Sequence, residues 1–403
     1  MTYVSKIIAQ MTGVFKPQQR AILALLNALM CFNGRATMRN LARYGAGSAK
    51  RLRRWASEDF DFFQLNELLL SETMAISFNQ LEDERPRQAI LIDATFTAKS
   101  GKYTEGLNFF HNGSCASKNK LQRGLEFNLI AALNVDEREA YALGAYQSDR
   151  KSALDVACAQ LINHKNTYQK ISKHVVADGY YARDGFVSAL KVNGYELITL
   201  LRRDAALRYL YEGEYSGRGY PRRYLGKVKY DDLSAWDKDE TLLDDKVVYS
   251  NTVNYKSWKR NLKVLVIVNT SGTRRILCST DLSLSPAEIL ELYQLRFQIE
   301  FLFRDAKQNT GLGHAQTLDT QGQEHFANAS FTALNLFRLE ERDEAIIADQ
   351  SRQERVSSIR SLKIRKHHRF ILNLFISRLA LSRDDKNLEP IIEEVSRVGA
   401  VVA

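Results

Sequence analysis

The spacing of apolar residues predicts an α/β core in the middle of the chain. Residues 88–97 are apolar and β-branched around a single acid, Asp93, as is typical of a buried strand. Residues 126–134 and 140–147 predict a β-hairpin. The same reasoning gives a helix at 151–163, a strand ending at Asp178, a helix at about 182–192 and a strand at 195–201. This order is typical of a mixed sheet with helices packed on it.

Helical spacing dominates the two ends of the chain. An apolar helix at 20–32 is followed by two short helices at 37–44 and 48–57, each beginning at a capping Thr or Ser. A glycine turn at 45–47 separates the short helices, so the pair is a helix-turn-helix candidate. Further helices are expected from about 322 to 398.

The segment from 203 to 284 has a different pattern, first irregular and rich in tyrosine, then strongly β. Its clearest strands are expected at 246–254, 261–270 and 274–279. A chain of 403 residues can form two or three domains. The patterns divide the chain into a helical domain at 1–80, an α/β core at 81–202 and 285–320, a β-rich insertion at 203–284 and a helical basic region at 321–403.

The charge balance indicates a polyanionic partner. The chain has 57 Lys and Arg against 47 Asp and Glu, a net charge of +10, with a pI of about 9.3. Seven Lys and Arg without an acid lie between residues 35 and 54, and nine against one acid lie between 352 and 383. Both stretches have apolar residues at helical spacing, so we expect basic helices in both.

The helix expected at 48–57 is the candidate for contact with DNA. Ala49, Leu52 and Ala56 share one face. The other faces carry Lys50, Arg51, Arg53 and Arg54. The alternative is an ordinary helical domain with a solvated basic face.

A chemically informative stripe lies between residues 293 and 307. Ser285 and Pro286 predict the start of a helix that continues to about 308. On such a helix Tyr293, Arg296, Glu300 and Lys307 fall within roughly 60° of one another. The plain alternative is an exposed ion pair between Arg296 and Glu300, worth a few tenths of a kcal/mol.

Two further acids can join Glu300. Asp93 lies inside the first expected strand, where an unpaired charge is costly. Asp178 ends another apolar run, and ligands of α/β sheets bind at the carboxyl ends of strands. Taken singly, Asp93 could be a satisfied buried polar group and Asp178-Gly179 a turn. Their order along the chain favours three carboxylates gathered over one mixed sheet.

These residues carry a resemblance to the DDE transposases of the insertion-sequence 4 group, which have a ribonuclease-H-like core. The motifs are Leu91-Ile-Asp93-Ala-Thr, Val175-Val-Ala-Asp178-Gly-Tyr-Tyr and the Tyr293, Arg296, Glu300, Lys307 signature. The similar layout runs from about residue 88 to 310, and the basic stretch 358–363 also resembles the family. The 122 residues from Asp178 to Glu300 (300 − 178) leave room for the insertion that family members carry.

The expected chemistry is phosphoryl transfer at two divalent metals, which three carboxylates can hold. Oxygen ligands favour Mg²⁺, with Mn²⁺ as a substitute. The resemblance implies that Asp93 bridges the ions while Asp178 and Glu300 each complete one. Arg296 and Lys307 are then expected to hold DNA phosphates, and Tyr293 to bond a phosphate or pack beneath the site. Arg304 is a further candidate for DNA contact.

The family resemblance also implies a reaction course. It consists of a nick at the transposon end, a hairpin intermediate, hairpin hydrolysis and strand transfer into target DNA, with a homodimer on two DNA ends. In related transposases a tryptophan of the insertion receives a flipped base, a role that Trp258 could fill. The alternative is that Trp258 packs against its own sheet, and Tyr255, Trp236 and the loop 218–223 are rivals for the base.

Other classes of protein fit less well. Four cysteines without CxxC spacing predict neither a zinc site nor a disulfide framework, and no membrane span or signal peptide is expected. A bacterial cytoplasmic protein, associated with the nucleoid when bound to double-stranded DNA, is the expectation. The rivals in function are a transposase-derived binding protein without catalysis and another ribonuclease-H-like nuclease, such as a resolvase.

Overall fold

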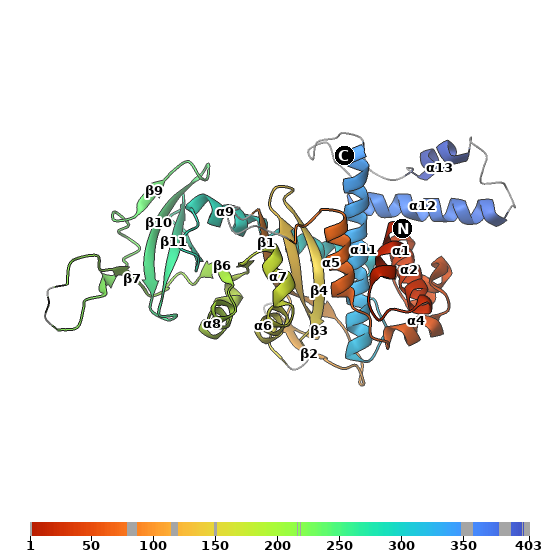
Figure 1. Cartoon of the computed structure of the whole chain (residues 1–403), viewed down its shortest axis with the longest axis horizontal. Helices are drawn as coiled ribbons and strands as arrows, with labels where there is room; N and C mark the ends of the chain where they lie inside the picture. The colour runs from red at the N-terminus through yellow and green to blue at the C-terminus, as the bar shows by residue number, and fades with distance from the viewer. Residues whose placement is uncertain are drawn as a thin grey trace.

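The protein is described by a computed structural model for residues 2–78, 87–113, 120–148, 151–215, 217, 219–347, 358–378, 388–396 and 398. The molecule is elongated (Figure 1). A β-rich part lies at one end, the helices of both termini lie at the other, and the mixed sheet lies between them.

The core is a mixed sheet, as the sequence predicts. Its strands are β1 (Gln88–Ala98), β2 (Asn108–His111), β3 (Leu121–Asn134), β4 (Glu139–Gln147), β5 (His174–Val176) and β6 (Glu196–Leu201). β1 is antiparallel to β3 and parallel to β5, and β5 is parallel to β6. The helices α6 (Ala153–Asn163), α7 (Lys165–Ile171) and α8 (Asp184–Val192) connect these strands. This is a ribonuclease-H-like arrangement, so the predicted fold class is confirmed.

The strands of the predicted insertion extend the same sheet. They are β7 (Leu207–Leu210), β8 (Tyr224–Lys227), β9 (Asp237–Asp239), β10 (Lys246–Tyr255), β11 (Arg260–Asn269) and β12 (Arg274–Ser279). β12 pairs with β6, so one sheet of twelve strands runs from the core into this segment. The β content is confirmed, whereas the division of the chain into domains stays a prediction.

The helix α11 (Thr320–Ile347) seals the outer edge of β4. Its Asn335 and Asn328 each bond both the N–H and the C=O of one β4 residue, Ala142 and Ala145, at 2.8–2.9 Å. The carboxylate of Glu324 accepts the N–H of Gln147 at 2.7 Å. An edge strand exposes backbone groups that must be satisfied, and these side chains satisfy them.

The amino-terminal helices are α1 (Thr2–Gln10), α2 (Lys16–Cys31), α3 (Met38–Leu41), the π-helical turn η1 (Ala42–Ala46), α4 (Ala49–Ala56) and α5 (Phe62–Glu72). Thr37 caps α3 and Ser48 caps α4, as predicted. Gly45 and Gly47 each have φ 85°, which favours glycine in this turn. The helix predicted at 37–44 is split between α3 and η1, whereas the pair of helices around the turn is confirmed.

The carboxyl-terminal helices are α12 (Ile359–Arg378) and α13 (Leu388–Ser396), and α12 lies across the amino-terminal helices (Figure 1). The predicted basic helix is present as α12, and acids from other helices pair with several of its cations. Lys366 pairs with Glu340 at 2.7 Å, and Arg365 pairs with Glu393 at 3.1 Å.

Within the described ranges, no helix is long and apolar enough to cross a membrane.

Candidate active site

The glutamate-bearing segment is three short helical pieces rather than the single helix predicted at 286–308. They are α9 (Pro286–Leu295), α10 (Gln298–Asp305) and the π-helical turn η3 (Ala306–Thr310). The predicted start is confirmed, because Ser285 and Glu288 form a capping box. The interruption falls at Arg296 and Phe297, whose N–H groups bond carbonyls three residues back at 3.3 Å. Such bonds tighten the helix, while Arg296 still contacts Glu300 and the ring of Tyr293, its neighbours on the predicted stripe.

The register of the sheet aligns the two aspartates. Leu91 of β1 pairs with Val176 of parallel β5. Asp93 and Asp178 each lie two residues beyond that pair, at the same edge of the sheet. The backbone carbonyl of Asp178 accepts the hydroxyl of Thr199 at 2.8 Å, which ties this residue to β6. Packing of α10 on β1 then brings Glu300 to the aspartates.

The carboxylates are close enough to perturb one another. Burial raises the pKa of Asp93 to about 7, and the negative charges of Asp178 and Glu300 add to the rise. The N–H of Ala94 and the guanidinium of Arg296 oppose it. Surplus negative charge in a half-buried site is the electrostatic condition that a cation relieves.

Arg296 lies between two of the three carboxylates. Its Nη2 donates to Glu300 Oε1 at 2.7 Å, and its Nη1 lies 3.4 Å from Asp93 Oδ2. The side chain is 15% exposed and its Nε has no partner in the described part of the chain. The ion pair that the sequence offered as the plain alternative is therefore formed, and it includes a second acid. The guanidinium also lies 5.7 Å from the ring of Tyr293.

The other candidate DNA contacts of this segment have separate surroundings. Lys307 lies on η3, where burial lowers its pKa. Arg304 is paired with Asp305 at 3.2 Å and stacks over Phe301 at 4.6 Å. Their contact with DNA stays a prediction.

The three acids have the ligand atoms that a metal ion needs, but their side chains are not gathered around one point in this conformation. Over the described residues, no three His, Cys, Asp or Glu side chains are gathered closely enough to hold an ion. The carboxylate oxygens are nevertheless those that Mg²⁺ prefers, and the acidic neighbours of Asp93 add to the rise in its pKa that burial causes. Arg296 stands among these oxygens and supplies the positive charge.

Trp258 lies in the turn between β10 and β11 and is only 4% exposed. It packs edge-on to Tyr255, with ring centroids 5.0 Å apart. The packing alternative therefore describes this conformation, and base stacking requires the indole to leave its core. The rival Trp236 is also buried and donates to Tyr209 at 3.0 Å, and Arg218 lies outside the described residues.

The basic side chains of α4 are placed as predicted. Leu52 and Ala56 are buried against the neighbouring helices. Lys50, Arg51, Arg53 and Arg54 are exposed. The face is available to a polyanion, and its contact with DNA stays a prediction.

Sequence reasoning missed two features near these sites. The hydroxyl of buried Tyr181 has no partner in the described part of the chain, and burial, then Asp93 and Asp178, raise its pKa. Its proximity to Asp178 in sequence was the available signal. The second feature is a buried pair at the other end of β5, where His174 Nε2 donates to Asp281 at 2.9 Å. No local pattern links two residues 107 positions apart.

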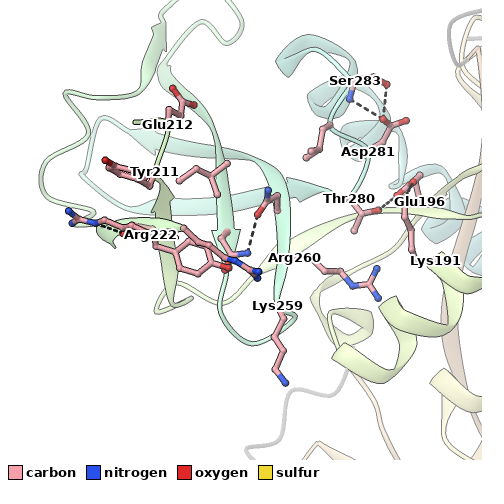
Figure 2. Close-up of a pocket in the computed structure, with 16 residues that line it drawn as sticks. Lys191, Glu196, Tyr211, Glu212, Arg222, Lys259, Arg260, Thr280, Asp281 and Ser283 are labelled. Carbon is pink, nitrogen blue, oxygen red and sulfur yellow. Dashed lines mark hydrogen bonds and ion pairs between the residues drawn. The ribbon is translucent and has the colours of Figure 1, made fainter. Parts of the chain in front are cut away.

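A groove of about 860 Å³ lies beside this pair, between the core and the strands of the insertion (Figure 2). Figure 2 shows Lys191, Glu196 and Asp281 on the core side, facing Tyr211 and Arg222 of the insertion. Two of its acids are paired, since Lys191 bonds Glu196 and Lys173 bonds Asp281.

A mixed sheet whose parallel strands β1 and β5 bring two acids to the same level defines the ribonuclease-H-like class. The family model described as the transposase DDE domain matches residues 84–336, well over half of the chain. The chain belongs to this family and is a DDE transposase, a nuclease and strand-transfer enzyme. The match includes Asp93, Asp178 and Glu300, and the family suggests DNA as the partner.

Other comparisons add little. No curated protein matches the chain. Among solved structures, the chain is similar to the crystal structure of the NurA nuclease from Sulfolobus solfataricus, with 9% identity over 72% of this chain and 92% of that chain. The TM-score is 0.25, which is too low to carry an argument.

Proposed function

We propose that this protein is the transposase of an insertion sequence of the 4 group and that Asp93, Asp178 and Glu300 are its catalytic acids. The observation that carries the proposal is the register of β1 and β5, which sets the two aspartates side by side. Glu300 and Arg296 approach the same point from α10 and the helix break before it. The Tyr293, Arg296, Glu300, Lys307 signature supports the choice of group.

The acids would hold two Mg²⁺ ions, with Asp93 shared and Asp178 and Glu300 each completing one site. Bound ions of this kind stabilise the charge that develops on the attacking and leaving oxygens of a phosphodiester. Mn²⁺ would substitute, because it accepts the same oxygen ligands.

The chain's own residues have distinct tasks in this proposal. Asp93 must be deprotonated to act as a ligand, and its pKa of about 7 makes the free site hold a proton near neutrality. Arg296 exchanges its bond to Asp93 for a DNA phosphate, which frees the carboxylate and neutralises the backbone beside the scissile bond. Lys307 binds a neighbouring phosphate, and Tyr293 supports the guanidinium from below.

The course of the reaction follows the family resemblance. The helices around Gly45 bind the terminal inverted repeats through Lys50, Arg51, Arg53 and Arg54, and Arg304 adds a contact near the core. Two protomers pair two ends, and cleavage proceeds by cut-and-paste through a hairpin. The exposed cations of α4 support the binding step.

Substitution of the acids tests the proposal. Asp93→Asn and Glu300→Gln should abolish Mg²⁺-dependent cleavage of a duplex carrying the inverted repeat that flanks the gene, while gel-shift binding persists. Glu291→Gln is the matched control, because Glu291 is an exposed acid on α9, outside the site. Cleavage by either variant at the wild-type rate would refute the assignment.

A further inference from the structure

A second hollow lies at the carboxyl end of β1 and has a volume of about 650 Å³. Four basic side chains line it: Arg35, Lys99, Arg123 and His314. None of the described residues that line it is acidic. In this respect it differs from the groove of Figure 2, where Glu196 and Asp281 accompany the cations.

The hollow forms where the amino-terminal helices meet the catalytic core. Arg35 precedes the capping residue of α3, and Lys99 follows β1 directly. The ring of His314, just beyond η3, accepts the N–H of Ala36 at 3.2 Å and joins the two regions. The basic groups therefore come from segments that only the tertiary fold brings together.

The positive charge of the hollow is not compensated within the protein. Arg35, Lys99 and Arg123 have no ion pair in the described ranges. Lys99 bonds only the carbonyl of Ala315, and Arg123 the carbonyl of Gly101 at 3.1 Å. Burial, and then the charge of Arg35, lowers the pKa of Lys99. The nearby acid Glu105 is engaged by the N–H of Thr320 at 2.9 Å.

A buried polar group of the same hollow also lacks a partner. Thr317 lines it and is only 8% exposed, yet its hydroxyl oxygen has no hydrogen-bond partner among the described residues. Buried hydroxyls are normally bonded, and leaving one unpaired costs about 1–3 kcal/mol. The oxygen is itself shielded from solvent, so the anion site rests on the clustered cations, which suit an anion with several oxygens, such as phosphate.

The position of the hollow relates it to the catalytic acids. β1 is parallel to β5 and continues beyond the level of Asp93 and Asp178, so its carboxyl end lies past the two aspartates in the direction of the strands. Lys99 follows Asp93 by six residues, about 20 Å along an extended strand. That length corresponds to about six base pairs of duplex, with one backbone charge per ~1.7 Å.

We infer that this hollow binds backbone phosphates of the DNA duplex, in the stretch that runs from the amino-terminal helices to the catalytic acids. The inference rests on the proposed function and adds a contact surface to it. The ligand is the phosphodiester backbone, read without regard to base sequence, because the charged side chains of the lining are all cations and phosphate contacts carry no sequence information.

The test measures how binding depends on salt. The full-length protein carrying Arg35→Gln and Arg123→Gln is titrated with a 30-base-pair duplex of arbitrary sequence at several salt concentrations, with fluorescence anisotropy as the readout. For each phosphate that is no longer neutralised, the slope of log K against log salt should become shallower by about 0.9, so the double variant should differ by about 1.8.

The control removes two charges elsewhere. Lys165→Gln with Lys170→Gln lies on α7, next to the amino end of β1, and should leave the slope unchanged. An unchanged slope in the Arg35 and Arg123 variant, with an unchanged melting temperature, overturns the inference, as does an equal change in the control. Wild-type cleavage with Mg²⁺ is scored separately. If the wild type cleaves DNA but the Arg35 and Arg123 variant keeps the wild-type slope, only phosphate binding in the hollow is refuted. If the variant's slope changes but the wild type does not cleave, only the proposed Mg²⁺-dependent reaction is refuted.

Discussion

The two ends of β5 lie beside aspartates in opposite electrostatic states. Beyond its carboxyl end, Asp178 lies beside Asp93, whose pKa is raised to about 7 by burial and by its acidic neighbours. At the amino end, hydrogen bonds from His174, and then from Ser283 and Lys173, hold the pKa of Asp281 well below its usual range. The three residues of β5 separate an acid whose pKa is raised, chiefly by burial, from an acid whose pKa is lowered by hydrogen bonds. Acids that the fold leaves uncompensated are candidates for chemistry, and satisfied ones hold the fold together.

The largest expected effect is the loss of cleavage rate when a proposed metal ligand is replaced by its amide. Asp178→Asn should lower the cleavage rate by about 10³-fold, because several kcal/mol of transition-state stabilisation depend on the ligand. It should leave the melting temperature nearly unchanged, since an amide oxygen can still accept the N–H of Tyr180. Single-turnover cleavage and thermal melts measure the two quantities. A large loss of stability with little loss of rate would reverse the comparison.

Trp258, like Asp281, is expected to contribute to the stability of the fold rather than to catalysis. Trp258→Ala should lower the free energy of unfolding by about 3–5 kcal/mol, because the indole is buried beside Tyr255. Urea unfolding of this variant and of Trp258→Phe gives the measurement. If the alanine variant is as stable as wild type but nicks DNA without making hairpins, the indole is a base-stacking residue instead.

Asp281→Asn should have a smaller effect on stability, about 2–3 kcal/mol, because charged hydrogen bonds to His174 and Lys173 weaken. The folded pKa of Asp281 is depressed, so this contribution is present above the ordinary pKa near 3.8 and is lost as pH falls below it. The difference in stability between variant and wild type should therefore be largest at pH 7 and smaller at pH 3, because the contribution fades progressively between the ordinary pKa and the depressed one. An equal difference in unfolding free energy at pH 7 and at pH 3 would show that the charge of Asp281 is not the cause.

The smallest effect concerns the pH dependence of the catalytic end. The folded pKa of Asp93 is raised from 3.8 to about 7, so the folded protein holds a proton that the unfolded chain releases. Its contribution to stability is present below about pH 4 and is lost as pH rises to about 7. In metal-free buffer Asp93→Asn should melt a few degrees above wild type at pH 8 and together with it at pH 4. A melting difference independent of pH would contradict this origin.

Much of the fold was predictable because local patterns specify it. The buried run around Asp93, the hairpin after it and the caps at Thr37, Ser48 and Ser285 are decided within a few residues. The continuous sheet was not predictable, because the pairing of β12 with β6 joins residues 276 and 201 across the insertion. The helix break at Arg296 was also missed, since its residues remain good helix formers and packing on β1 decides their bonding.

The candidate site divides in the same way. Three acids could be chosen from strand, turn and helix patterns, and the sheet register supports the choice of two of them. The partners of Arg296 could not be decided from sequence, because spacing allows an ion pair and a phosphate contact equally. The hollow of Arg35, Lys99 and Arg123 was invisible, because its members come from three separate segments.

The helix α11 fixes the distance between the catalytic sheet and the amino-terminal helices. It bonds the edge of β4 through Asn328 and Asn335 and also packs on α2, so the same rigid body touches the catalytic sheet and the amino-terminal helices. Its 28 residues span about 42 Å. Under the proposed function the amino-terminal helices bind the repeat and the sheet carries the catalytic acids, so α11 fixes the distance between the bound repeat and the cut. Changing its packing would shift where along the DNA the cut falls, rather than how fast it is made.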